Sequence, residues 1–94
     1  MPEPDNRREI VRIEVVWKKD AWYVVLYYAD KTSDDLNVFN NKEDAEARAR
    51  EIGHWAADRQ GSTVEARFKT KDGKIPAGEH GTATYGHDPE VTKG

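Results

Sequence analysis

The sequence predicts an α+β fold in which one helix packs on one face of a single, mainly antiparallel sheet of three or four strands. Two observations lead to this prediction. A helix with both ends marked spans residues 39–61, and its small alanines suit close packing on a sheet. Strand-like apolar runs lie on both sides of that helix, giving the order β-β-β-α-β. Ninety-four residues are enough for one domain, residues 1–94, with one core layer.

The first two strands are predicted from the spacing of their apolar residues. From Glu9 onward, apolar and polar side chains alternate, as in a half-buried strand. One row of this strand contains Val11, Ile13, Val15 and Trp17, and the other contains Arg12, Glu14, Val16 and Lys18. Residues 19–21 form a tight turn, and residues 22–29 are apolar on both faces, which indicates a central strand. Its two rows are Trp22, Val24, Leu26 and Tyr28, and Tyr23, Val25 and Tyr27.

A short edge strand at residues 36–39 then leads into the helix. Asn41 is placed to cap the first turn, with Asp44 three residues on, and Gly61 supplies the left-handed residue that ends many helices. The helix should contact the sheet through one narrow stripe, which consists of Ala45, Ala49, Ile52 and Ala56. Trp55 adjoins this stripe and is expected to close one end of the core.

A fourth strand follows the helix, because Val64, Ala66 and Phe68 alternate with polar residues up to a turn at Asp72-Gly73. We expect this strand to lie beside the first through a right-handed crossover, in the spatial order 3-2-1-4. Residues 1–8 are interpreted as a frayed lead-in, and residues 76–94, rich in Gly, Pro and Thr, as an irregular tail.

The amino-acid composition excludes some classes of function and favours others. Cysteine is absent, which excludes disulfides and thiolate metal sites. The N-terminal residues contain no apolar signal core, and no apolar run in the sequence is long enough to span a membrane, so we expect a cytoplasmic protein with no membrane partner. The net charge of −3 is evenly distributed, whereas proteins that bind phosphate backbones usually carry a basic excess. The charge therefore favours a protein or small-molecule partner.

No residues form a pattern that indicates catalysis or metal binding. His80 and His87, with Glu79 and Asp88, match no compact ligand spacing, and His54 is expected on the helix surface. Ser33 and Ser62 lack the sequence context of a nucleophile, and no glycine-rich phosphate loop is present. We therefore expect no cofactor, no metal and no enzymatic activity.

The sheet face away from the helix is the candidate site. Its apolar part consists of Val16, Tyr23, Val25 and Tyr27, and its basic surround of Arg12, Lys18, Arg67 and Lys69. Aromatic residues with arginine favour a protein interface, including self-association as a homodimer. The same combination would suit a single nucleic-acid strand, which is the second hypothesis. In a third interpretation, the Lys and Arg stems simply cover the valines.

Residues 85–89 also leave two interpretations open. This Tyr-Gly-His-Asp-Pro segment could be a recognition element. Alternatively, Tyr85 folds back over an edge of the core, and the glycine and proline form the turn.

Several short motifs together resemble the small bacterial and phage family called domain of unknown function 2188. The family's D-G-W-x-V strand opening is similar to residues 20–24, and its F-x-T-x-x-E-A helix entry is similar to residues 39–45. The A-R-E-L that follows in that helix is similar to residues 49–52. Its D-G-R-I turn and closing Y-G-x-D-P are similar to residues 72–75 and 85–89. This chain departs from the pattern at Ala21, which replaces the turn glycine, and at Asn41, which replaces the capping threonine. The resemblance implies a fold, but it implies no activity and no catalytic residues.

Overall fold

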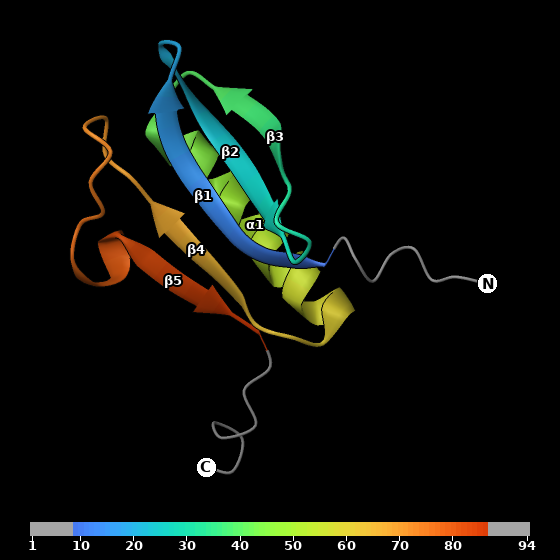
Figure 1. Cartoon of the computed structure of the whole chain (residues 1–94). Coiled ribbons are helices and arrows are strands. Elements are labelled where there is room, and N and C mark those ends of the chain that lie inside the picture. Colours follow the sequence, from blue (N-terminus) through green and yellow to red (C-terminus); the bar gives the residue numbers. More distant parts are fainter. Residues whose placement is uncertain (1–8, 87–94) are drawn as a thin grey trace.

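The computed structural model describes residues 9–86, so the predicted lead-in at residues 1–8 and the last eight residues of the predicted tail lie outside the described part. One helix lies behind a five-stranded mixed sheet (Figure 1). The elements in chain order are β1 (Ile10–Lys18), β2 (Ala21–Tyr28), β3 (Ser33–Phe39), α1 (Lys42–Gln60), β4 (Val64–Phe68), a short 3-10 helix (Gly78–His80) and β5 (Thr82–Tyr85). The predicted α+β class, with one helix on one sheet, is confirmed.

The strands lie in the order β3-β2-β1-β4-β5. Strands β1, β2 and β3 form an antiparallel meander, whereas β4 runs parallel to β1 after the helical connection. This is the predicted order 3-2-1-4, with one further strand. Strand β5 pairs antiparallel with β4 and forms the second edge of the sheet.

Helix α1 begins and ends at the predicted residues. The Asn41 side-chain oxygen accepts the Asp44 backbone N–H at 2.9 Å, and its amide donates to the Asp44 carboxylate at 3.1 Å. These two bonds satisfy groups that the first turn would otherwise leave unpaired. Gly61 has a left-handed φ of 71° and donates its N–H to the Ala57 carbonyl. The buried stripe contains the predicted Ala45, Ala49, Ile52 and Ala56, together with Gly53 and Ala57.

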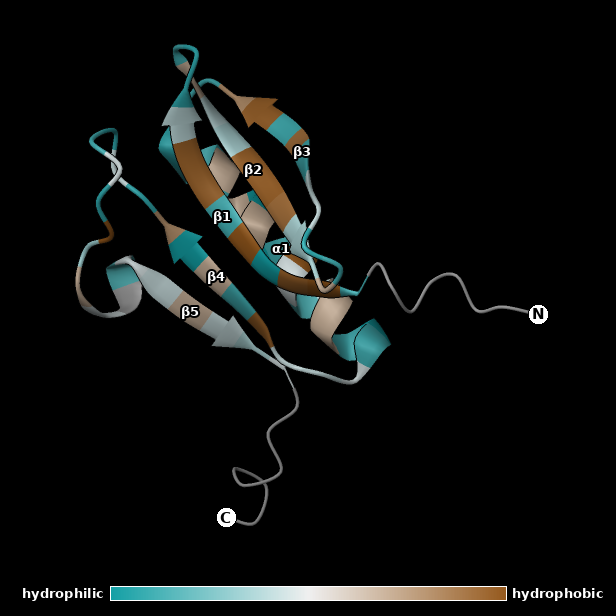
Figure 2. Ribbon diagram, viewed as in Figure 1, coloured by the Kyte–Doolittle hydropathy of each residue, from teal (hydrophilic) through white to brown (hydrophobic). Residues whose placement is uncertain are grey.

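The core lies between α1 and the predicted face of the sheet. Trp22 is 6% exposed and packs edge-on against Trp17, with ring centroids 5.1 Å apart. The largest fully buried aliphatic residues of the sheet are Ile13, Val15, Val24 and Val64. The hydropathy colouring in Figure 2 shows long apolar segments in β1 and β2, two of the three strands with neighbours on both sides. The continuous apolarity that predicted a central strand therefore matches the position of β2.

Two of the predicted core residues are exposed. The pairing of β1 with β2 shifts register between Ile10 and Arg12, so Ile10 enters the core and Val11 is 39% exposed. Trp55, which was expected to close one end of the core, is 56% exposed. The core contacts of the helix continue instead through Gly53 and Ala57, on the opposite side of the alanine stripe from Trp55.

The prediction was also wrong about the extent of strand structure. The sheet has five strands rather than three or four, because residues 82–85 of the predicted irregular tail form β5. Strand β3 begins at Ser33 instead of Leu36, since an edge strand tolerates the polar residues of that segment. Of the two interpretations of residues 85–89, the second is confirmed for Tyr85, whereas Asp88 and Pro89 of the expected turn lie outside the described residues. The Tyr85 ring is 7% exposed and belongs to the core.

Candidate functional site

All eight predicted site residues lie on the sheet face away from α1, because alternate residues of a strand point to opposite faces. Three strands contribute them. Register places Val16 opposite Tyr23, and Arg12 opposite Tyr27. Within residues 9–86, no helix or strand packs on this side of the sheet (Figure 1). The open face is defined here as Arg12, Glu14, Val16, Lys18, Tyr23, Val25, Tyr27, Asp35, Val38, Glu65, Arg67 and Lys69.

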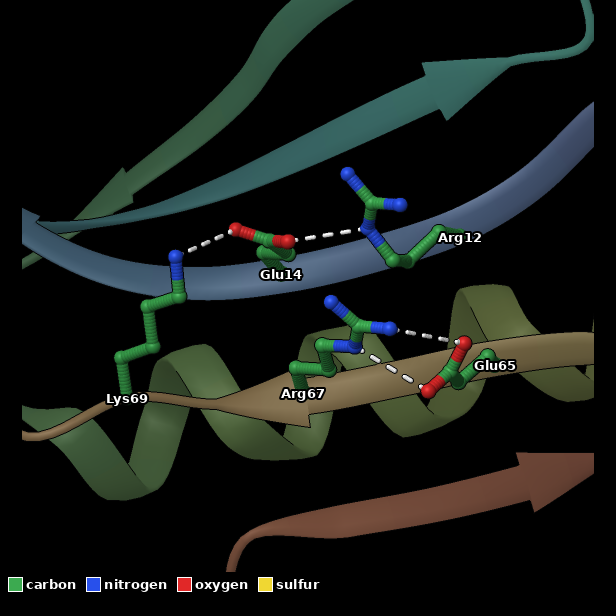
Figure 3. A network of polar contacts seen from close by, with 5 residues as sticks. All are labelled: Arg12, Glu14, Glu65, Arg67 and Lys69. Atoms are coloured by element: carbon green, nitrogen blue, oxygen red, sulfur yellow. Dashed lines mark hydrogen bonds and ion pairs between the residues drawn. The ribbon is translucent and has the colours of Figure 1, made fainter. Parts of the chain in front are cut away.

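Glu14 lies at the centre of the open face and is only 3% exposed. Its carboxylate accepts a hydrogen bond from Arg12 Nε at 2.9 Å and forms an ion pair with Lys69 Nζ at 3.0 Å (Figure 3). A carboxylate this deeply buried is costly unless cations pair with it. The Glu14 carboxylate therefore holds one cation from β1 and one from the end of β4 in fixed positions.

The other two predicted cations also have carboxylate partners. Arg67 donates to Glu65 through Nε at 3.0 Å and Nη2 at 3.3 Å, and Lys18 pairs with Asp35 at 3.0 Å. The hydrogen bond to Glu65 raises the pKa of the Arg67 guanidinium above its already high value. The open face carries four cations and three carboxylates, which leaves one net positive charge in a chain whose total is −3.

Cations also lie against the two tyrosine rings. The Arg12 guanidinium carbon is 4.2 Å from the centre of the Tyr27 ring, and Lys18 Nζ is 4.8 Å from that of Tyr23. Such contacts combine cation–π attraction with packing of the aliphatic stems. The tyrosines are half-buried, whereas Val25 between them is 5% exposed. Val25 is therefore packed beneath the neighbouring side chains of the open face, and it exposes little area to a partner.

The open face also contains residues that were not predicted as site residues. Val38 on β3 lies opposite Tyr23 and is 55% exposed, so it extends the apolar strip to the edge of the sheet. The expected strand at residues 36–39 contained Val38, but its pairing opposite Tyr23 could not be predicted from that strand alone. Glu14 was predicted in the correct row of its strand. Its position between apolar neighbours indicated a buried carboxylate, which needs a cation as partner.

The remaining polar candidates that the structure describes lie apart from one another. The His54 ring packs on Tyr85 with centroids 4.5 Å apart, and Ser62 donates its hydroxyl to Glu9 at 2.7 Å. His80 is exposed, whereas His87 and Asp88 lie outside the described residues. Across residues 9–86, no three His, Cys, Asp or Glu side chains are grouped so that they could bind a metal ion.

Comparisons with protein-family models, curated proteins and solved structures find no match to this chain. In the part of the chain that the structure describes, no helix has the length and apolar character needed to cross a membrane.

Proposed function

We propose that this chain is a non-catalytic binding module that contacts a protein partner, including a second copy of itself, through the open face. One observation carries the proposal. Val16, Tyr23, Tyr27 and Val38 form an apolar and aromatic strip that no described element covers. Aromatic side chains surrounded by arginine are typical of the centres of protein interfaces.

The ion pairs of the open face support a protein partner over a nucleic acid. A single-strand platform needs a surplus of positive charge that neutralises successive phosphates. Here each of the four cations already has a carboxylate within 3.0 Å, and only one positive charge is left over. Nucleic-acid binding at the same face therefore remains the second hypothesis. It predicts an affinity that falls steeply with salt concentration.

We also propose that the chain belongs to domain of unknown function 2188, on the strength of the motifs at residues 20–24, in the first half of the helix, at the Asp72-Gly73 turn and at residues 85–89. The Asn41 cap and the positive φ of Gly73 support this assignment, because they fulfil the local roles expected of those motifs. A cytoplasmic location is part of the same proposal, and it is supported by the absence of cysteine.

The experiment that tests the proposed function replaces both rings of the strip. A Tyr23→Ser, Tyr27→Ser double variant should stay folded, because both rings lie outside the core cluster. It should lose self-association in sedimentation velocity, or lose a partner that the wild-type protein captures reproducibly. Trp55→Ser is the matched control, since it removes an exposed aromatic ring from the helix side of the molecule.

Two results would contradict the proposed function. One is a protein that remains monomeric at every concentration while the double variant captures the same partners as the wild type. The other is an equal loss of binding in Trp55→Ser and in the tyrosine double variant. That result would mean that the open face has no special role.

A further inference from the structure

Arg12 has hydrogen-bonding capacity that the fold does not use. Only its Nε is engaged by Glu14, and Figure 3 shows its two terminal nitrogens pointing away from that carboxylate. No acceptor within residues 9–86 pairs with these two nitrogens. The guanidinium plane is nevertheless fixed, because Glu14 holds it on one side and the Tyr27 ring lies against it.

Arg67 lies on the neighbouring strand and has one terminal nitrogen left after pairing with Glu65. Parallel register places Arg12 beside Glu65, and Glu14 beside Arg67, so the two arginines are diagonal neighbours on adjacent strands. Figure 3 shows the remaining nitrogen of Arg67 on the side of β1. With Lys69 held by Glu14, three cations surround one buried carboxylate.

We infer that the partner of the open face presents an acidic polypeptide segment, whose carboxylate is received by the free guanidinium nitrogens of Arg12 and Arg67. This inference rests on the proposed function. A guanidinium with two parallel N–H groups free matches the geometry of a carboxylate, and charge-assisted bonds of this kind are strong. Because the arginine is held in place before binding, little conformational entropy is lost when the segment docks.

Charge favours a polypeptide carboxylate over a nucleic acid. The open face has a surplus of one positive charge within a chain of net charge −3. That surplus suits a partner with a few carboxylates and adjacent apolar side chains, which would contact Tyr23, Tyr27 and Val38. It is too small for a continuous phosphate backbone, which the acidic remainder of the protein would repel.

The test measures binding of a fluorescein-labelled oligoglutamate peptide by fluorescence anisotropy at low salt. Oligoglutamine of the same length is the neutral control, and labelled oligothymidylate is the nucleic-acid probe. Arg12→Gln and Arg67→Gln should each weaken oligoglutamate binding about tenfold or more, the usual cost of a charge-assisted hydrogen bond. Arg59→Gln should leave binding unchanged, because Arg59 is on α1 beside Trp55. Circular dichroism and thermal melts check that each variant is folded.

A further variant separates charge from geometry. Arg12→Lys keeps the positive charge beside Glu14 but lacks the two parallel N–H groups, so it should recover only part of the affinity that Arg12→Gln loses.

Three results would overturn the inference. They are equal binding of oligoglutamate and oligoglutamine, an equal loss in Arg59→Gln and Arg12→Gln, and tighter binding of oligothymidylate than of oligoglutamate. If the inference fails while the tyrosine double variant still loses its partner, the proposed function stands and the partner is not acidic. If the tyrosine variant also keeps its partner, both proposals fail.

Discussion

Gly53 determines how Tyr85 packs at the edge of the core. Tyr85 is in β5, and its ring lies against α1 where Gly53 has no side chain. A Cβ placed on Gly53 would lie 2.7 Å from Tyr85 Cε2 and closer still to Cδ2. Glycine is normally unfavourable inside a helix, so here the packing of one ring outweighs helix propensity.

Gly53→Ala should therefore destabilise the protein. Helix propensity alone predicts a gain of up to about 1 kcal/mol. The clash with Tyr85 predicts a loss of about 1–3 kcal/mol, as in other overpacked cores. Urea denaturation measures the difference, and Ala47→Gly at an exposed position of α1 gives the size of the propensity effect alone. A more stable Gly53→Ala variant would mean that Tyr85 does not pack against the helix.

The Tyr85 hydroxyl is buried and has no partner in full hydrogen-bonding geometry among the described residues, although the Arg50 side chain lies near it. Burial raises the pKa of the Tyr85 phenol above its usual value of about 10, and the nearby positive charge of Arg50 offsets this only in part. The folded state therefore keeps the Tyr85 proton at a pH where the unfolded chain loses it. In consequence, stability associated with this group is present below about pH 10 and is lost as the pH rises further.

Tyr85→Phe removes this group without changing the ring. We expect the variant to equal or exceed the wild type at neutral pH by up to about 1 kcal/mol, since a buried hydroxyl without a partner is costly. Above about pH 10 its stability should fall less steeply than that of the wild type. Urea denaturation of both proteins at neutral and alkaline pH measures this. Parallel curves would show that Tyr85 ionises as readily in the folded protein as in the unfolded chain.

At the scale of elements, the contact between α1 and the sheet depends on small side chains. Ala45 and Ala49 are fully buried, so the helix backbone lies close to the strands. Ala49→Leu should cost about 1–3 kcal/mol, because the larger side chain has no space. Ala47→Leu is the matched control on the exposed side of the same helix and should be nearly neutral, as both residues favour helix. Thermal melts compare the two variants, and equal melting temperatures would mean that the buried stripe is misplaced.

Helix and strand boundaries that are set by residues close together in the sequence were predictable. Those that depend on pairing between strands far apart in the sequence were not. The ends of α1 follow from Asn41 and Gly61, whose capping bonds involve residues at most four positions away. In contrast, β5 has only four residues and forms by pairing with β4, for which the sequence gives no local cue. The exposure of Val11 likewise results from a register shift against β2, and a single strand's alternation cannot reveal such a shift.

At the scale of the whole molecule, α1 covers one face of the sheet, and paired charged side chains lie on the other face. Alternation within the strands was sufficient to place the eight predicted residues on the same face. It could not show that Arg12 and Lys69, far apart in the sequence, both pair with Glu14. That arrangement depends on β4 lying parallel to β1, and it explains how a glutamate can be 3% exposed in a sheet.

The central claim is that contacts with a partner are made on the open face, and chemical shifts measured during a titration test this claim most directly. Isotope-labelled protein is titrated with the oligoglutamate peptide while backbone amides and arginine Nε–H signals are followed by NMR. We expect the largest changes at Arg12, Tyr27 and Arg67, with helix α1 unaffected. Changes centred on Trp55 and the exposed side of α1, with the open face unchanged, would contradict the claim.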